Sequence, residues 1–143
     1  MVSGEMKELD TPSDWIEIEV NDRFSFQLPS ILKEVDVKGI DSFVRRWESQ
    51  DLIVHFDYGL YSDPLTMYTK KKSYEATLDN IGGHSTSIVS FQKEDGWYFM
   101  AVHFHDLGRD RWGRIVKLTF IVESSQHVKR EVPLRIVKSI SFR

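Results

Sequence analysis

The chain has 143 residues, with 19 Lys and Arg against 22 Asp and Glu, which gives a formal net charge of −3. A chain of this length forms one domain with one hydrophobic core, and 41% hydrophobic residues exclude a wholly disordered protein. Because there is no cysteine, disulfides, thiol nucleophiles and iron–sulfur clusters are excluded. The slightly acidic balance argues against non-specific binding to nucleic acid.

The N-terminal residues carry no apolar stretch typical of a secretory signal, and no apolar run approaches the ~20 residues of a membrane helix. We therefore expect a cytoplasmic protein, with the mature fragment of an exported protein as the alternative. Residues 1–14 are polar and are predicted to form a flexible lead-in. The single domain then covers residues 15–143.

The first predicted element is a β-hairpin over residues 16–28, where apolar and polar residues alternate. A two-residue loop would divide the apolar side chains between the two faces. A three-residue loop, 21–23, places them on one face, with Val20 opposite Phe24, and is the predicted arrangement.

A second hairpin is predicted from residues 43–48 and 52–58, joined by a turn at 49–50 that places Trp47 opposite Leu52. The next segment, residues 59–73, is predicted to be a loop with at most a short strand. Its length is unusual for a compact domain, so it is either functional or partly disordered.

A three-stranded meander is predicted for the middle of the chain. The Asp-Gly pair at 95–96 is typical of a two-residue type I′ turn and pairs Phe91 with Met100. The next strand, 114–123, continues the sheet with Met100 opposite Phe120. The three strands then share one apolar face, and the reverse face is apolar enough to predict a covering segment.

The last segment is predicted to be an amphipathic helix that packs on the meander, because Val128, Val132, Ile136 and Ile140 recur every four residues. Pro133 either kinks this helix or lies in its first turn. The predicted fold class is α+β, with a mostly antiparallel sheet of two hairpins and a meander and a C-terminal helix packed on it.

No nucleophile elbow, phosphate loop, zinc-protease or dinucleotide motif is present, so neither enzymatic activity nor a cofactor is expected. His103 and His105 share one face of a strand and are predicted to be structural, with Lys117 opposite His103. The alternative is a small metal-binding protein or a metal-dependent enzyme that uses these two histidines. A hydrolytic carboxylate pair from Asp57 and Asp63 is a further alternative, although the sequence does not determine their separation.

The segment 108–114 combines three arginines with a tryptophan, the residue types most enriched at binding hot spots. A partner-binding loop is the functional prediction, with a solvated hairpin loop or an anion-substrate clamp as alternatives. The lysine run at 70–72 is typical of a solvated surface, with a docking patch as its alternative. The candidate binding residues are Arg109, Arg111, Trp112, Arg114, Tyr58 and Tyr61.

Three short motifs resemble, in their order, those of PsbP-like domains. Residues 24–29 (FSFQLP) are similar to an opening F-x-F-x-x-P, residues 80–84 (NIGGH) to a Gly-Gly hairpin, and residues 134–142 to a closing I-x-x-S-h-x-F. The string FDYG at 56–59 is similar to bacterial members. The resemblance spans roughly residues 15–142.

The resemblance implies an α/β/α sandwich, as in the photosystem II extrinsic subunit PsbP and the Ran-binding Mog proteins, and a binding or accessory function. The clear long helix of those members between the second hairpin and the meander is missing here, so neither photosystem nor Ran binding is carried over. The predicted function is a non-enzymatic binding or accessory domain with a protein partner, as a monomer or weak homodimer. A structural subunit that dimerises through a sheet edge is a third hypothesis.

Overall fold

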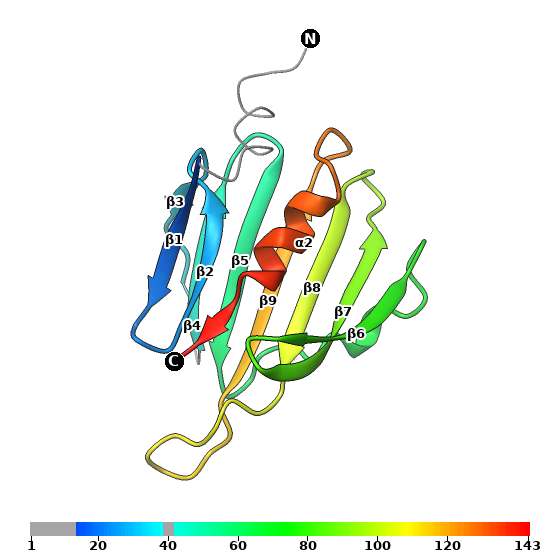
Figure 1. Ribbon diagram of the computed structural model, residues 1–143. Coiled ribbons are helices and arrows are strands. Elements are labelled where there is room, and N and C mark those ends of the chain that lie inside the picture. Colours follow the sequence, from blue (N-terminus) through cyan, green and yellow to red (C-terminus); the bar gives the residue numbers. More distant parts are fainter. Residues whose placement is uncertain (1–13, 39–41) are drawn as a thin grey trace.

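The computed structural model describes residues 14–38 and 42–143 (Figure 1). Residues 1–13 of the predicted lead-in lie outside the described residues. Asp14 is described, and its carbonyl oxygen accepts a hydrogen bond of 2.9 Å from the Ser30 N–H. No helix among the described residues is long and apolar enough to cross a membrane.

The described strands form two antiparallel sheets, one of seven strands in the order β3-β4-β5-β9-β8-β7-β6 and one of three in the order β1-β2-β10. The described helical elements are the 3₁₀ helix η2 and the α-helix α2, so the α+β class is confirmed. The element bounds are β1 Trp15–Val20, β2 Phe24–Pro29, β3 Lys33–Val35, β4 Ser42–Glu48, β5 Leu52–Gly59, η2 Thr66–Tyr68, β6 Glu75–Ile81, β7 His84–Gln92, β8 Tyr98–Phe104, β9 Lys117–Ser124, α2 Glu131–Lys138 and β10 Ser141–Phe142.

The β1–β2 hairpin has the predicted register, with Val20 opposite Phe24. Asn21 and Asp22 adopt the left-handed conformation, with φ values of 46° and 56°, which these two residue types tolerate better than most. The Arg23 N–H then donates to the Val20 carbonyl at 2.8 Å and closes the three-residue loop. Here the alternation of apolar residues was sufficient to determine the register.

The β4–β5 hairpin differs from the prediction, since Trp47 lies opposite Val54 rather than Leu52. The turn lies one residue further along the chain, where the Ser49 N–H donates to the Leu52 carbonyl at 2.8 Å. Asp51 is held there by Ser125, whose N–H and hydroxyl donate to its carbonyl and carboxylate. A shift of two residues keeps every side chain on its predicted face.

The predicted β7–β8 register is also wrong. Here the difference is one residue, so the predicted pairing would place side chains of one strand on the opposite face of the sheet. Phe91 lies opposite Phe99 rather than Met100. The turn has three residues, 94–96, because the Lys93 N–H donates to the Trp97 carbonyl at 2.7 Å. Gly96 alone in this turn has a positive φ, whereas a type I′ turn requires two such residues.

The β8–β9 pairing places Met100 opposite Val122 rather than Phe120. Each side chain of β9 still lies on its predicted face of the sheet, because the observed and predicted registers again differ by two residues. Between the pairs Phe104–Leu118 and Arg109–Ile115, four residues (105–108) stand opposite two (116–117). This bulged connection caused the shift, and no sequence motif marks it.

The C-terminal segment is only partly the predicted helix. Val128, Val132, Ile136 and Ile140 are all buried, but α2 covers Glu131–Lys138 alone. Pro133 lies in the first turn of α2, one of the two predicted placements. After α2 the chain forms β10, a strand that pairs with β2 and was not predicted.

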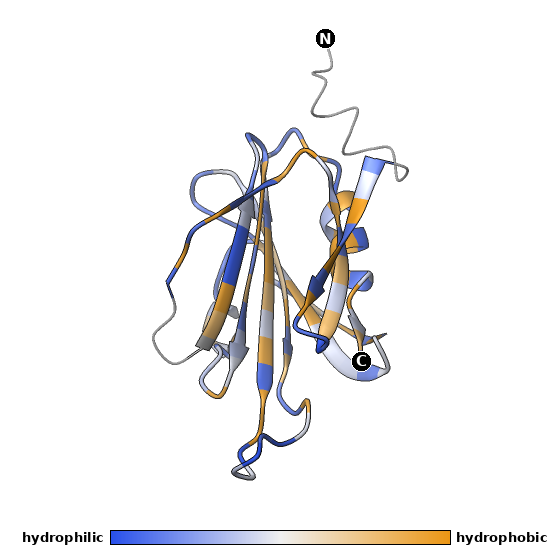
Figure 2. Cartoon of the chain, turned by 90° about the vertical axis from the view of Figure 1, so that its left-hand side faces the viewer, coloured by the Kyte–Doolittle hydropathy of each residue, from blue (hydrophilic) through white to orange (hydrophobic). Residues whose placement is uncertain are grey.

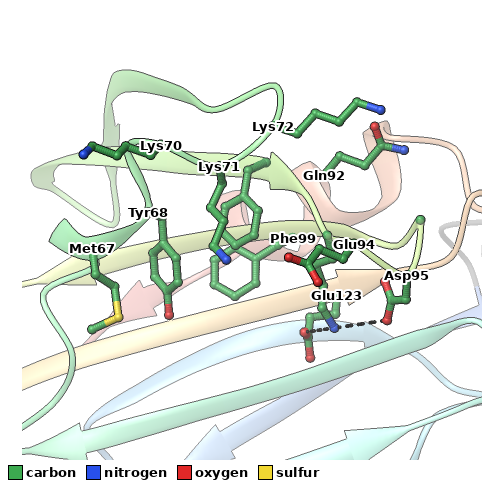
Figure 3. Close-up of a pocket in the computed structure, with 13 residues that line it drawn as sticks. Met67, Tyr68, Lys70, Lys71, Lys72, Gln92, Glu94, Asp95, Phe99 and Glu123 are labelled. Atoms are coloured by element: carbon green, nitrogen blue, oxygen red, sulfur yellow. Dashed lines mark ion pairs between the residues drawn. The ribbon is translucent and has the colours of Figure 1, made fainter.

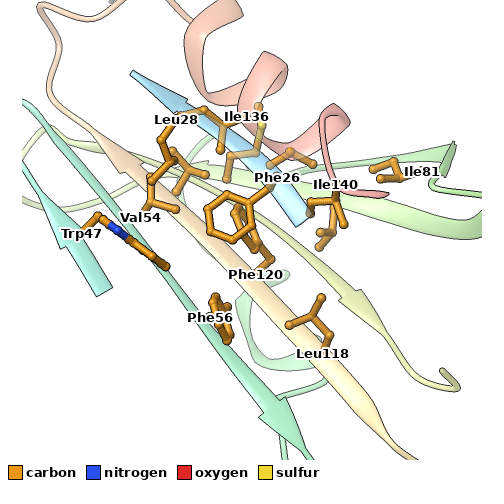
Figure 4. Close-up of a cluster of buried hydrophobic side chains, with 14 of the residues drawn as sticks. Phe26, Leu28, Trp47, Val54, Phe56, Ile81, Leu118, Phe120, Ile136 and Ile140 are labelled. Carbon is orange, nitrogen blue, oxygen red and sulfur yellow. The ribbon is translucent and has the colours of Figure 1, made fainter. Parts of the chain in front are cut away.

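The small sheet and α2 lie on the same face of the large sheet (Figure 1), and their apolar side chains form the main core between them (Figure 4). Phe26 is central to it, with ring centroids 4.8 Å from Phe120 and 5.3 Å from Trp47. Polar and apolar residues alternate along much of the sheet (Figure 2), so most strands bury one face, whereas the middle of β8 is buried on both faces.

The other face of the large sheet carries a second apolar cluster from Val89, Phe91, Phe99 and Ala101. The segment that covers this cluster lies within residues 59–73, which the sequence predicted to be a loop. Leu65 and Tyr68 of this segment pack on the cluster. Leu65 is 3% exposed and has a φ of 63°, an unfavourable conformation for a branched residue. Its burial against the cluster offsets that strain.

Candidate functional site

The predicted binding loop is held in a fixed shape by one aspartate. Asp110 accepts hydrogen bonds from the Trp112 and Arg114 N–H groups at 2.8 and 2.9 Å, and from Arg114 Nε at 2.8 Å. The Arg114 N–H, followed by the Arg114 guanidinium and the Trp112 N–H, lowers the pKa of the Asp110 carboxyl against the effect of desolvation. Since the backbone is fixed by these contacts, the loop presents its side chains in a defined arrangement.

Trp112 is 64% exposed, and the guanidinium groups of two arginines lie over its ring. The guanidinium carbon of Arg111 is 4.1 Å from the centroid of the Trp112 ring, and that of Arg114 is 4.9 Å away. Both distances are within the range of cation–π attraction. The ring is therefore oriented in solvent by its neighbours rather than by the core.

A hollow of ≈ 590 Å³ separates this loop from the tip of the β1–β2 hairpin and the end of β5. It brings together Tyr58 and three of the predicted loop residues, Arg109, Arg111 and Trp112. The other two predicted residues, Arg114 and Tyr61, do not line the hollow, and the Tyr61 side chain is 72% exposed. The residues that line the hollow are Arg23, Tyr58, Leu107, Arg109, Asp110, Arg111, Trp112 and Val116.

The hollow has a positive charge balance. Asp110 is paired with Arg114, while Arg23, Arg109 and Arg111 form no ion pair with any carboxylate of the described residues. Arg23 was not predicted as a site residue. It lies in the 21–23 loop, whose shape the sequence indicates, but no sequence signal places that loop beside the 105–116 connection.

His103 is held by a hydrogen bond to Thr119, its cross-strand partner, so Lys117 does not lie directly opposite it as predicted. The Thr119 hydroxyl donates to the Asp63 carbonyl at 2.6 Å, so the His103 Nδ1–H donates to that hydroxyl at 2.8 Å. Burial, followed by the charges of His105 and Lys117, lowers the pKa of the His103 imidazole, and Asp63 partly opposes this shift.

The alternative metal site lacks a third ligand in the part of the chain that the structure describes, where no three His, Asp or Glu side chains gather to hold an ion. His105 is exposed. Its partner in the pair, His103, has Nδ1 occupied by Thr119, so only Nε2 of that ring has a free lone pair.

Asp57 and Asp63, whose separation the sequence left open, line one small hollow of ≈ 240 Å³ together with His55, Arg46 and Thr119. Asp57 Oδ1 is buried and meets no hydrogen-bond donor within the described residues. The Arg46 guanidinium is paired with Glu48 at 2.5 Å, so it does not neutralise this oxygen. The two carboxyls share a space, and Asp63 is held there by the Leu65 N–H, which donates to its Oδ1 at 2.8 Å.

Glu123 carries the largest shift in pKa among the described carboxyls. The neighbouring His55 and Lys93 side chains lower its pKa from 4.5 to about 2, although burial raises it. Lys93 Nζ lies 2.8 Å from Oε1, whereas His55 Nε2 lies 3.7 Å from Oε2. We assign most of the effect to Lys93, because 3.7 Å is too long for a hydrogen bond.

Replacement of Glu123 by Gln should lower the free energy of unfolding at pH 7 by up to about 3 kcal/mol. The pKa in the folded state lies below that of the unfolded chain. The unfolded chain therefore binds more protons between pH 4.5 and about 2, and the stabilisation is lost as the pH falls through this window. Urea unfolding from pH 7 to 2.5 should show the two proteins converging in acid. Glu94→Gln, at an exposed site, is the matched control and should change stability by less than about 0.5 kcal/mol; an equal loss in both variants would contradict the assignment.

No protein-family model matches the sequence, and a search of curated proteins finds no relative.

Proposed function

We propose that the chain is a non-enzymatic binding domain that docks a protein partner on the arginine–tryptophan loop, residues 107–114. The observation that carries the proposal is the exposed Trp112 ring, whose centroid lies 4.1 and 4.9 Å from the guanidinium carbons of Arg111 and Arg114. Tryptophan and arginine are the most frequent hot-spot residues, and a ring oriented before binding loses little conformational entropy when a partner docks.

The charge of the adjacent hollow favours an acidic segment of the partner. Arg23, Arg109 and Arg111 are free to pair with carboxylates, and the guanidinium group binds carboxylates through two parallel hydrogen bonds. The hollow also contains apolar side chains, from Leu107 and Val116. A segment that combines acidic residues with an apolar one fits both features.

The PsbP-like fold is part of the proposal, and contacts between the three similar motifs support it. The Gln27 N–H of the opening motif donates to the Ser139 hydroxyl of the closing motif at 2.8 Å. Gly82 of the Gly-Gly hairpin lies so close to Phe142 that a Cβ there would be 2.7 Å from the ring. Motifs far apart in the sequence thus contact one another, as expected if they belong to one architecture.

Trp112→Ala should weaken the binding of a partner by about 30-fold, equivalent to about 2 kcal/mol, without changing the melting temperature. The reason is that Trp112 contacts solvent and two arginines rather than the core. The partner would be obtained by co-purification from the native source, and its dissociation constant measured by calorimetry for both proteins.

Tyr61→Ala is the control for this measurement, because Tyr61 is an exposed aromatic residue outside the hollow. Its affinity should equal that of the unchanged protein. A large loss of thermal stability in Trp112→Ala would contradict the proposal and indicate a structural role for the loop. Equal affinity of the unchanged protein, Trp112→Ala and Tyr61→Ala for the partner would contradict it as well.

A further inference from the structure

A hollow of ≈ 1060 Å³ lies away from the arginine–tryptophan loop. It is a groove between the segment 67–72, which follows the start of η2, and the end of the β7–β8 hairpin (Figure 3). This is the place where the lysine run at 70–72 and the second apolar cluster meet. Neither feature has a role in the proposed partner site.

Aromatic rings form one side of the groove. The Tyr68 and Phe91 rings stack with centroids 5.0 Å apart and planes 27° apart, and Phe91 stacks on Phe99 at 4.4 Å and 23°. Phe91 and Phe99 are buried and Tyr68 is partly exposed. Exposed Met67 extends this apolar surface along the groove. A flat ring could continue the stack on Tyr68.

The lysines form the other side, on a backbone of defined shape. The Lys71 N–H donates to the Tyr68 carbonyl at 2.9 Å, and the Gln92 N–H donates to the Lys72 carbonyl at 2.9 Å. The second bond attaches the run to β7. In Figure 3 the Lys71 side chain reaches in toward Tyr68 and Phe99, while the ends of Lys70 and Lys72 point away to either side.

The charge of these lysines is not neutralised within the groove. Glu123 and Asp95 are both paired with Lys93, at 2.8 and 3.6 Å. None of the three lysines forms an ion pair with another described residue. The Lys71 ammonium group thus stands beside the aromatic surface, and one further carboxylate, that of Glu94, is in the lining.

We propose that this groove binds a small ligand that combines a flat aromatic ring with an anionic group, a carboxylate or a phosphate. The ring stacks on Tyr68 and contacts Met67, and the anion pairs with Lys71. Lysine acts as a point charge toward both kinds of anion, so the groove itself does not select between them. The site is independent of the arginine–tryptophan loop.

The test is an NMR titration of the full chain with 2-naphthoate and with 2-naphthyl phosphate. Both should bind saturably with dissociation constants below about 1 mM, and the shifted amides should be those of the groove. The neutral 2-naphthalenemethanol should bind at least about tenfold more weakly, and acetate and inorganic phosphate should not bind measurably. A preference for one naphthyl anion would identify the anion that the site takes.

Lys71→Gln should weaken both naphthyl anions by about fivefold or more, whereas Lys71→Arg should retain binding. The matched control is Lys33→Gln, an exposed lysine of β3, which should not change the affinity. The proposal is overturned if neither naphthyl anion binds saturably, if the neutral alcohol binds equally well, or if Lys71→Gln binds like the unchanged protein.

Discussion

Removal of residues 125–143 should leave a chain that is insoluble or has no cooperative unfolding transition. This segment contributes α2 and β10 to the main core, where Ile136 and Val137 are fully buried. It also closes the small sheet, since β10 pairs with β2. Without it, the apolar face of β8 and β9 beneath α2 would be exposed to water, an apolar patch that monomeric proteins rarely tolerate. Thermal unfolding followed by near-ultraviolet circular dichroism would measure the loss.

A point substitution separates loss of packing from a general effect of truncation. Ile136→Ala should remain folded and lose about 2–5 kcal/mol of unfolding free energy, the usual cost of a cavity at a buried isoleucine. Leu134→Ala, on the same helix but only partly buried, should lose less. If the truncated chain stays soluble with an unchanged melt, the C-terminal segment is not part of the core.

Phe26→Ala should cost about 3–5 kcal/mol of unfolding free energy. The Phe26 ring is 1% exposed and joins the two sheets through edge contacts with Phe120 and Trp47, at 4.8 and 5.3 Å. Truncation leaves a cavity that neither sheet can fill by moving alone, because each is fixed by its own hydrogen bonds. Denaturant unfolding gives the loss directly.

Phe43→Ala is the matched comparison for this result. Phe43 lies on β4 and is 41% exposed. Its truncation therefore leaves no buried cavity and should lower the free energy of unfolding by at most about 1 kcal/mol. Equal losses at the two positions would mean that the small sheet is not packed on the large one through Phe26.

The local composition of the sequence predicted the candidate binding loop, but not the other segments that line the adjacent hollow. Trp112 and its arginines are local neighbours in the chain, so their clustering can be seen in the sequence. Tyr58 and Arg23 reach the same hollow from two other segments. The residues next to Tyr58 and Arg23 in the sequence do not indicate that these two side chains line one hollow.

The groove beside the lysine run shows the same limit more strongly. The run at 70–72 resembles any solvated charge cluster when taken alone. Its position beside Phe91 and Phe99 depends on the burial of Leu65 and on the bond from the Gln92 N–H to the Lys72 carbonyl. These are contacts between residues twenty or more positions apart.

The sequence by itself determined the α+β class, the positions of most strands and the three-residue β1–β2 loop with its register. Each of these depends on a period of two or on a short local turn, both of which are properties of neighbouring residues. It also determined that the apolar stripe from Val128 to Ile140 is buried.

Only the tertiary structure decided the remaining registers, the strand β10 and the neighbours of each loop. Alternation cannot distinguish registers that differ by two residues, since both leave the same faces buried. The β4–β5 and β8–β9 pairs therefore depended on Asp51 bonding to Ser125 and on the 105–108 bulge. The β7–β8 pair depended on whether the turn at Gly96 has two residues or three. For β4–β5 and β8–β9, a few hydrogen bonds selected one of several arrangements that bury the same faces. For β7–β8 the alternation could not exclude a shift of one residue, because both faces of these two strands carry buried apolar side chains.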